Sequence, residues 1–367
     1  MPQVNEQRAL DTFLELVRID SPSGQEDRIA SRLAEDLRAL HLEVRQDSAG
    51  NLIARRAGRG RLASEELVLL GAHMDTVQPG TGIQPQILDG VIRSGGTTIL
   101  AADDKAGITA ILEAVRSADE QALDVRPLEV VFTVQEETGL TGAKLLNIKN
   151  LHAKRGAMLD SNGPVGNIVT QGPAQNSIRA VVYGKAAHAG VAPETGVNAL
   201  VAAARALAEM RLGRIDAETT ANFGVIRGGT ATNVVPDRIE LEGETRSRDE
   251  EKLAQQTAHM KSLLEKMAHA TGGRAEVQVE RSYDAINLTP DSPWVKLVER
   301  AVRACGLQPQ LTATGGGSDA NILNGKGIAT VNLGVGFGLP HSVDEHLAVA
   351  DLVKACTLVL AILTVDA

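Results

Sequence analysis

Hydrophobic residues in the first half of the chain follow two alternating periodicities. Short apolar runs that are typical of buried strands are separated by helical patterns, in the order of a strand at 66–77, a helix at 104–118, a strand at 128–137 and an apolar segment that ends at Asp160. This alternation predicts an α/β domain with a mostly parallel central sheet.

The pattern changes after the Gly-Pro pair at 172–173. Six amphipathic stretches then follow in the order strand, helix, strand, strand, helix, strand, at 177–184, 198–210, 221–228, 237–246, 251–270 and 275–283. This βαββαβ order predicts a ferredoxin-like α+β unit, a four-stranded sheet backed by two helices. The α/β rhythm returns at about residue 286. We therefore expect one domain at 1–173 and 286–367, interrupted by a second domain at 174–285.

Composition and charge narrow the classes of function. The formal net charge is −9, and there is no aromatic-rich basic stripe, so nucleic acid is not an expected partner. Residues 1–20 lack the pattern of an export signal, which predicts a cytoplasmic protein. The apolar run at 352–365 contains Lys354 and is shorter than the roughly 20 residues that span a bilayer, so we interpret it as a core helix and expect no membrane partner.

Several apolar strands end at acidic or imidazole side chains. The candidates near these ends are His73, Asp75, Asp103, Asp104, Glu136, Glu137 and Asp160. In open α/β sheets, ligands collect beyond the carboxyl ends of the strands. Burying several carboxylates together is costly without positive charge, so the pattern predicts a divalent metal ion at this edge.

Each candidate also has a structural alternative. His73 and Asp75 lie on one face of an extended strand, so the carboxylate either holds one ring nitrogen while the other binds metal, or His73 is a satisfied core histidine. Asp104, at the start of a helix, is explained equally well as a capping residue. Asp160 precedes Ser-Asn-Gly, which is also typical of an Asx-turn.

Glu136 and Glu137 directly follow a buried apolar strand. Adjacent carboxylates there can divide two roles, since one binds metal while its neighbour accepts a proton from water, although an acidic pair alone is usually a solvated loop. His341 and His346 flank a later loop, and the residues alone do not choose between them as a ligand. Imidazoles and carboxylates without thiolate favour zinc, with cobalt or manganese as alternatives.

Five motifs along the chain resemble, in order, those of the M20 metallopeptidases. They are HMDTV, ADDKAG, QEETG, the aspartate of MLD, and PHS near the end. Within that family, the peptidase T, or tripeptidase, branch is the most similar. The similarity lies in the exact sequences ADDKAG and EETG and in the segment ATNVVPD. The resemblance spans essentially the whole chain. It implies a zinc-peptidase-like catalytic domain with an inserted lid or dimerisation domain.

The resemblance also implies roles for individual residues. Two divalent metal ions would be bound by His73, Asp103, Glu137, Asp160 and His341. Asp103 would bridge the two ions and be followed by a cis peptide bond. Glu136 would be the general base, and Asp75 would orient His73.

The inserted block resembles the lid domain of the family. This implies a homodimer in which His188 reaches the active site of the neighbouring subunit and stabilises the developing oxyanion. Asn233 and Arg246 would contact substrate, although a surface salt bridge is the alternative for Arg246. Gly316 and Gly317 lie in TGGGSDAN, which resembles the substrate-binding glycine loop of the tripeptidases but has Gly315 where they carry an arginine.

These features together predict a dinuclear exopeptidase, an aminopeptidase or tripeptidase that hydrolyses short peptides with metal-activated water. An N-acyl amino acid deacylase or a carboxypeptidase of the same family is one alternative, because the scissile amide is chemically alike and only distal contacts differ. A non-catalytic binding or scaffold protein is another. Such a protein would have no need for Glu136 beside Glu137.

Overall fold

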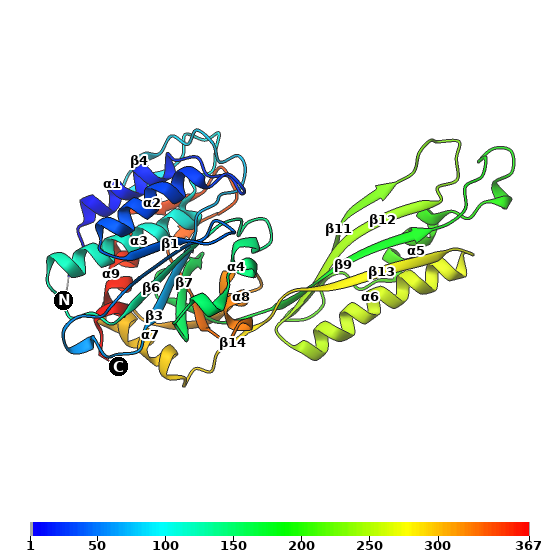
Figure 1. The fold of residues 1–367 in the computed structure, drawn as a ribbon. Coiled ribbons are helices and arrows are strands. Elements are labelled where there is room, and N and C mark those ends of the chain that lie inside the picture. Colours follow the sequence, from blue (N-terminus) through cyan, green and yellow to red (C-terminus); the bar gives the residue numbers. More distant parts are fainter. Residues whose placement is uncertain (1–2, 367) are drawn as a thin grey trace. The chain divides into compact units, whose positions relative to one another are not determined.

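The computed structural model describes residues 3–366, which form two compact units (Figure 1). The first unit runs up to Gln171, includes Ile286–Ala313 and continues from Ser318. The second comprises Gly172–Ala285 together with Thr314–Gly317. The sequence does not suggest this grouping of the four residues at 314–317. Each unit has its own hydrophobic core.

A nine-stranded mixed sheet forms the centre of the first unit. Its order is β1-β2-β6-β3-β7-β16-β8-β14, with β15 paired to β8. The neighbours β6, β3, β7 and β16 run parallel to one another. The strands are β1 (Glu43–Gln46), β2 (Leu52–Arg56), β3 (Val68–His73), β6 (Leu128–Thr133), β7 (Arg155–Ser161), β8 (Asn167–Gly172), β14 (Ile286–Asn287), β15 (Gln310–Ala313) and β16 (Ala329–Gly334).

Helices cover both faces of this sheet. Alternate residues of the central strands enter different clusters: Leu70 and Val130 join the large core, whereas Leu69 and Val131 join a smaller one. The large core includes residues of α1 (Glu6–Val17), α2 (Asp27–Ala39), α3 (Ala102–Glu120), α7 (Pro293–Ala304) and α9 (Val349–Thr364). The smaller one includes residues of α8 (Asp319–Gly325) and Leu146, which directly follows α4 (Thr141–Leu145).

All but the last residue of the run at 352–365 lie in α9, and the prediction of a core helix is confirmed. No helix within residues 3–366 is long and apolar enough to cross a membrane.

A small second sheet of the first unit joins distant segments. Its order is β17-β18-β5-β4, and the loop between β17 and β18 carries His341. The antiparallel pairing of β18 with β5 brings this loop near the segment that leads to α3. These strands are β4 (Gln86–Leu88), β5 (Val91–Arg93), β17 (Phe337–Gly338) and β18 (His346–Ala348).

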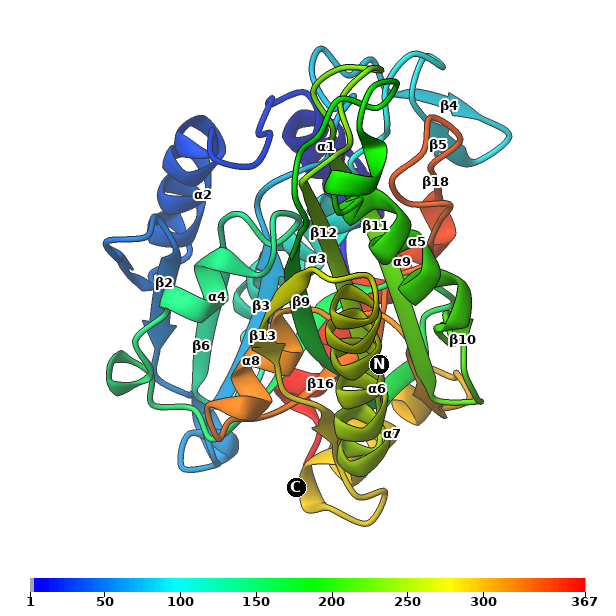
Figure 2. The same cartoon turned by 90° about the vertical axis from the view of Figure 1, so that its right-hand side faces the viewer.

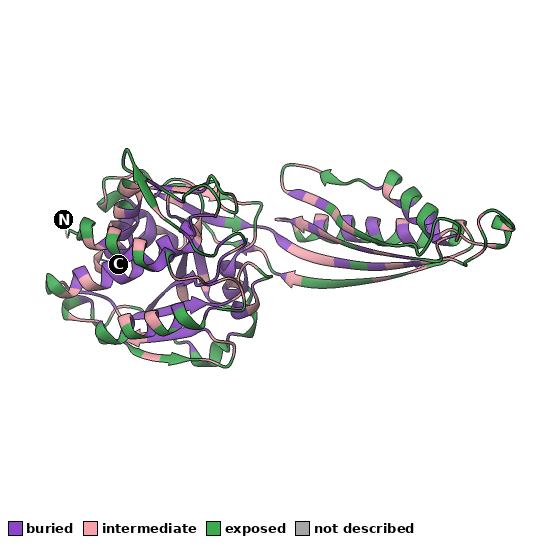
Figure 3. Ribbon diagram, turned by 90° about the horizontal axis from the view of Figure 1, so that it is seen from above, coloured by how far each residue is buried: buried purple, intermediate pink, exposed green. Residues whose placement is uncertain are grey.

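The second unit is an antiparallel sheet with two helices on one face (Figure 2). Its order is β10-β11-β12-β9-β13, which is the predicted ferredoxin-like arrangement with the short β10 added at one edge. Burial alternates along β9 and β12, because one face packs against the helices (Figure 3). The elements are β9 (Ala174–Tyr183), α5 (Ala199–Glu209), β10 (Gly213–Arg214), β11 (Thr219–Gly228), β12 (Arg238–Ser247), α6 (Glu250–Ala270) and β13 (Arg274–Tyr283).

The predicted fold class is therefore confirmed: a mostly parallel α/β sheet and a separate antiparallel α+β unit. The β1–β2 hairpin and the small sheet are not predicted from the sequence, because their strands are short and carry few apolar residues.

One lysine links α8 to the end of α4 on the smaller helical layer. Lys326 directly follows α8, and its Nζ donates to the carbonyl oxygens of Ala143, Lys144 and Leu146 at 2.7, 2.8 and 2.6 Å. These carbonyls lie at and just after the end of α4, where the helix does not continue to supply its usual N–H donors. The cation therefore holds the two helices together beside the loop that carries the glutamate pair.

We expect Lys326→Met to lower the free energy of unfolding by about 2 kcal/mol, because charged hydrogen bonds are lost while the methylene chain is kept. Urea denaturation measures this change. Lys354→Met, on the exposed side of α9, is the matched control and should cost about 0.5 kcal/mol or less. Equal losses in the two variants would contradict the assignment.

Candidate metal centre

His73 ends the fully buried strand β3, and its ring is held from one side. Nδ1 lies 3.0 Å from the backbone oxygen of Asp75 and 3.5 Å from its Oδ1. Nε2 faces Asp103 Oδ1 at 3.1 Å and Asp160 Oδ1 at 3.8 Å. With Nδ1 donating to the carbonyl, the Nε2 lone pair is free to bind a metal ion.

Asp103 lies between two imidazoles. Its Oδ1 is 3.1 Å from His73 Nε2, and its Oδ2 is 3.5 Å from His341 Nε2. The Asp103–Asp104 peptide bond is cis, as the family resemblance implies. Burial alone would raise the pKa of Asp103, but hydrogen bonds with His341 and His73 outweigh it and hold the pKa well below its usual value.

The carboxylate of Asp104 accepts hydrogen bonds from two backbone N–H groups. Oδ2 accepts a hydrogen bond from His73 N and Oδ1 one from Gly107 N, both at 3.2 Å. A Cβ at position 107 would lie 2.4 Å from Asp104 Oδ1 and 2.6 Å from the Leu159 oxygen, which explains this glycine. The capping alternative therefore describes Asp104 well.

His341 reaches the cluster from the loop between β17 and β18. Its Nε2 is 2.9 Å from Glu137 Oε1, and hydrogen bonds to Asp103 and Glu137 raise the pKa of His341 to about 10. Of the two histidines that the sequence leaves open, the structure brings His341 into the cluster. His346 instead places Nδ1 2.9 Å from the backbone oxygen of Asp344.

Asp75 shapes the turn that presents the glutamate pair. Its fully buried carboxylate accepts hydrogen bonds from Glu136 N at 2.9 Å, Glu137 N at 3.2 Å and Ser23 Oγ at 2.6 Å. Burial and the nearby Asp160 carboxylate raise the pKa of Glu136 well above its usual value. A carboxylate with such a pKa is suited to accept a proton at neutral pH.

Asp160 lies near the end of β7, where an asparagine of the adjacent strand holds its backbone. Asp160 N donates to Asn332 Oδ1, and Asn332 Nδ2 donates to Asp160 O, both at 3.0 Å. Its side chain is left to face His73. Burial raises the pKa of Asp160 well above its usual value, and the Asp103 charge adds to this effect.

The donor set fits a divalent cation. The ligand atoms of His73, Asp104 and Asp160 lie within 4.8 Å of one another, and so do those of His73, Asp103 and Glu137. The raised pKa values of Asp104, Asp160 and Glu136 reflect burial and mutual repulsion, which a cation would relieve. This edge of the sheet is therefore a candidate metal site.

Comparison with known proteins agrees with this geometry. Residues 69–364 match peptidase family M20/M25/M40. The chain belongs to this family. The predicted membership of the M20 metallopeptidases, and with it the prediction of a hydrolytic enzyme, is thus confirmed.

Two solved structures and one curated relative are similar over nearly the whole chain. The crystal structure of aminopeptidase PepT from Bacillus cereus is 43% identical, covers 98% of each chain and has a TM-score of 0.91. That of a tripeptidase from Staphylococcus aureus is 41% identical, covers 99% of this chain and 98% of its own, and has a TM-score of 0.94. Peptidase T from Aliivibrio fischeri is 26% identical over 98% of each chain.

The residues predicted to contact substrate all lie in the second unit. His188 is exposed, and its Nδ1 accepts a hydrogen bond from Gly190 N at 3.2 Å. Ala189 N donates to the backbone oxygen of Asn233 at 2.9 Å, so His188 and Asn233 lie on adjoining loops. The Asn233 side chain is also exposed.

Arg246 forms the salt bridge that the sequence offers as its alternative. Its Nε and Nη2 bind the carboxylate of Glu244 at 2.9 and 3.0 Å. Gly316 is exposed, whereas a Cβ on Gly317 would lie 2.2 Å from the Tyr283 ring. Packing against Tyr283 therefore explains Gly317 independently of any substrate.

Sequence reasoning misses Glu345, a buried acid that positions Asp103. Its Oε1 accepts a hydrogen bond from Asp103 N at 3.0 Å, and its Oε2 accepts from Leu100 N and Ala101 N at 2.7 and 2.8 Å. Burial raises the pKa of Glu345 to about 7, although these backbone hydrogen bonds lower it. No local pattern reveals the role, because its partners lie 242 to 245 positions earlier.

Asp319 is a second missed residue, at the start of α8. It is fully buried, and its Oδ2 accepts a hydrogen bond from Thr133 Oγ1 at 2.5 Å. This contact ties α8 to the end of β6, just before Glu136. In the sequence TGGGSDAN, the family resemblance concerns the glycines, so it gives no reason to select this aspartate.

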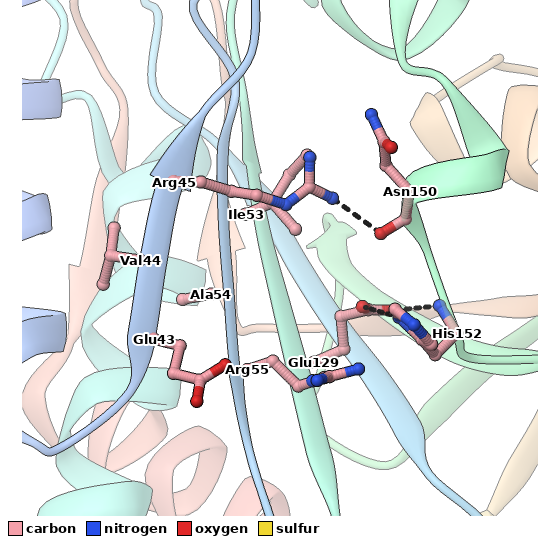
Figure 4. A pocket seen from close by; sticks show the side chains of 9 residues that line it. All are labelled: Glu43, Val44, Arg45, Ile53, Ala54, Arg55, Glu129, Asn150 and His152. Carbon is pink, nitrogen blue, oxygen red and sulfur yellow. Dashed lines mark hydrogen bonds and ion pairs between the residues drawn. The ribbon is translucent and has the colours of Figure 1, made fainter.

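A surface pocket of about 180 Å³ beside the β1–β2 hairpin is a poorer candidate site (Figure 4). Its one buried acid, Glu129, uses Oε2 to accept hydrogen bonds from His152 N and Ala153 N at 2.9 and 3.1 Å. Glu129 therefore serves the loop after α4. Its lining residues are Glu43, Val44, Arg45, Ile53, Ala54, Arg55, Glu129, Asn150 and His152.

We expect Glu345→Ala to weaken binding of divalent metal by about 10- to 100-fold. The three backbone N–H groups that position Asp103 would lose the carboxylate that accepts their hydrogen bonds. Isothermal titration calorimetry with zinc measures the affinity. Asp344→Ala removes the exposed neighbouring acid and is the matched control. Unchanged affinity in Glu345→Ala would show that Asp103 does not depend on this residue.

Proposed function

We propose that the chain is a dinuclear metal-dependent exopeptidase that hydrolyses short peptides, as an aminopeptidase or tripeptidase. One observation carries the proposal: the carboxylate of Asp103 presents one oxygen to His73 and the other to His341. A carboxylate shared in this way is typical of two-metal hydrolytic sites. The substrate class is supported by the similarity to structures described as an aminopeptidase PepT and a tripeptidase.

The donors separate into two groups around Asp103. His73 and Asp160 would complete one metal site, and Glu137 and His341 the other. Asp104 is not assigned as a ligand, because both its oxygens already accept backbone hydrogen bonds. Zinc suits this set of imidazoles and carboxylates, with cobalt or manganese as alternatives. Bound metal would polarise the scissile carbonyl and lower the pKa of water.

Glu136 is the proposed general base. It would accept the proton of the attacking water and return it to the leaving amine, for which its raised pKa is suited. Asp75 fixes the backbone of Glu136 through the 2.9 Å hydrogen bond, and its Oδ1 lies 3.5 Å from Nδ1 of His73. Asp75 would therefore act through its neighbours and not on the substrate.

The second unit would supply substrate contacts in a homodimer. His188 is exposed and has no carboxylate partner among the described residues, so it is free to donate to an oxyanion in the neighbouring subunit. Asn233, Gly316 and Gly317 are the other proposed contacts. Arg246 would have to exchange Glu244 for a substrate carboxylate before it could bind one.

We expect Glu136→Gln to lower kcat on an unblocked tripeptide by at least about 100-fold while two metal ions still bind. Steady-state kinetics and metal analysis on the zinc-loaded enzyme measure the two quantities. Glu35→Gln, on the exposed face of α2, is the control and should keep full activity. Retained turnover in Glu136→Gln would contradict the role of general base.

The same assay tests the substrate class. We expect kcat/KM of the wild-type enzyme to be higher on unblocked tripeptides and dipeptides than on N-acetyl amino acids. The opposite order would favour the deacylase alternative.

Mixing two inactive variants tests the contribution of His188 from the partner subunit. His188→Ala and Glu136→Gln are each expected to be inactive. If His188 acts across a dimer, one of the two sites in each mixed dimer is intact, so an equal mixture should recover about a quarter of wild-type activity. The two variants are first dissociated together and then allowed to reassociate, so that mixed dimers form before activity is measured. No recovery, with mixed dimers verified by mass spectrometry, would contradict action in trans.

A further inference from the structure

Three arginine side chains gather at the amino edge of the central sheet, at the opposite end of the strands from the metal centre. Arg126 precedes β6, Arg155 begins β7 and Arg300 lies on α7. The positive charges of Arg155 and Arg300 both lower the pKa of Arg126, so the three side chains lie near one another. The six residues of β6 separate this edge from the carboxyl edge by about 20 Å.

Several N–H groups of this cluster are buried without an acceptor. Arg126 is 1% exposed, and although its Nη2 donates to the Val365 oxygen, its Nε and Nη1 have no hydrogen-bond partner within residues 3–366. The Nε groups of Arg155 and Arg300 are buried and unpartnered in the same way. Buried donors and buried charges are normally paired, so an acceptor is missing here.

The acidic side chains near the cluster do not supply this acceptor. Glu66 pairs with Arg155 Nη2 at 2.7 Å, but its side chain is 73% exposed. Glu65 contributes charge but forms no described hydrogen bond with Arg126. Burial and the charge of Arg155 lower the pKa of Arg126, and Glu65 only partly opposes them.

Asp366 also leaves the cluster incomplete. Its side chain pairs with Arg61, which lies outside the three arginines. Its charge acts on Arg126 without a described hydrogen bond, and its backbone oxygen lies 3.4 Å from Arg300 Nη2. The like charges of the three guanidinium groups therefore remain poorly compensated.

Trp294 fixes the orientation of one of these guanidinium groups. Arg155 Cζ lies 5.6 Å from the centroid of the Trp294 ring, and Trp294 Nε1 donates to the Gly156 oxygen at 2.8 Å. An aromatic face limits the rotation of the planar fork. Guanidinium forks held in this way suit the oxygens of a carboxylate or a tetrahedral anion.

We propose that Arg126, Arg155 and Arg300 together bind one oxyanion, a carboxylate or a tetrahedral anion such as sulfate. The oxyanion accepts the N–H groups that lack a partner, and its charge offsets the repulsion among the three cations. Two sources supply this chemistry: a free anion from solution, or the side-chain carboxylate of Asp366 once it leaves Arg61. The site stabilises the first unit and takes no part in hydrolysis.

Thermal unfolding of the zinc-loaded, full-length enzyme tests the proposal. We expect 10 mM sulfate to raise Tm by about 3 °C over chloride of equal ionic strength. Arg126→Met, which removes the guanidinium but keeps an unbranched side chain, should abolish this shift. Arg300→Gln provides a second variant should Arg126→Met fail to fold. Arg303→Met, an exposed residue one turn along α7, is the matched control and should keep the wild-type shift.

Asp366→Asn, which removes the carboxylate and keeps the backbone, separates the two sources. If the wild-type enzyme does not respond to sulfate but Asp366→Asn is less stable and regains its Tm in sulfate, Asp366 supplies the carboxylate. No response in either protein would overturn the proposal, and so would equal shifts in wild type, Arg126→Met and Arg300→Gln. Peptidase activity is not the readout, so these outcomes do not depend on the proposed function.

Discussion

The repulsion between buried carboxylates at one edge of the central sheet is the constraint on which the rest of the first unit depends. The structure resolves it by giving these groups two kinds of partner. Asp75, Asp104 and Glu345 accept hydrogen bonds from backbone amides and thereby shape the loops around the edge. Asp103 and Glu137 face imidazole nitrogens instead. This division separates the acids that build the site from those available to a metal ion.

Much of the fold is accessible from the sequence, because the central strands are mostly apolar. β3 and β6 are buried along their whole lengths, so each appears as a hydrophobic run that stops at the site, interrupted in β6 by Glu129. In the second unit, amphipathic alternation reveals the strands and helices equally well. The β1–β2 hairpin and the small sheet escape prediction, because strands of two to five residues with mixed side chains carry little periodic signal.

The candidate site divides in the same way. Local context singles out His73 and the glutamate pair, since they end buried strands. The choice of Asp103 over Asp104, and of His341 over His346, rests on the family motifs, because it depends on which backbone amides and side chains lie nearby in three dimensions. Glu345 could not be predicted at all. Its role exists only because the pairing of β18 with β5 carries it to the segment before Asp103.

The central claim is that Asp103 is shared by two metal ions, one beside His73 and one beside His341. Anomalous diffraction from crystals grown with zinc tests it most directly. The account predicts two zinc peaks, each about 2.0–2.2 Å from its histidine nitrogen and from one oxygen of Asp103. A single peak, or two ions bridged by Asp104 with Asp103 unbound, would contradict it.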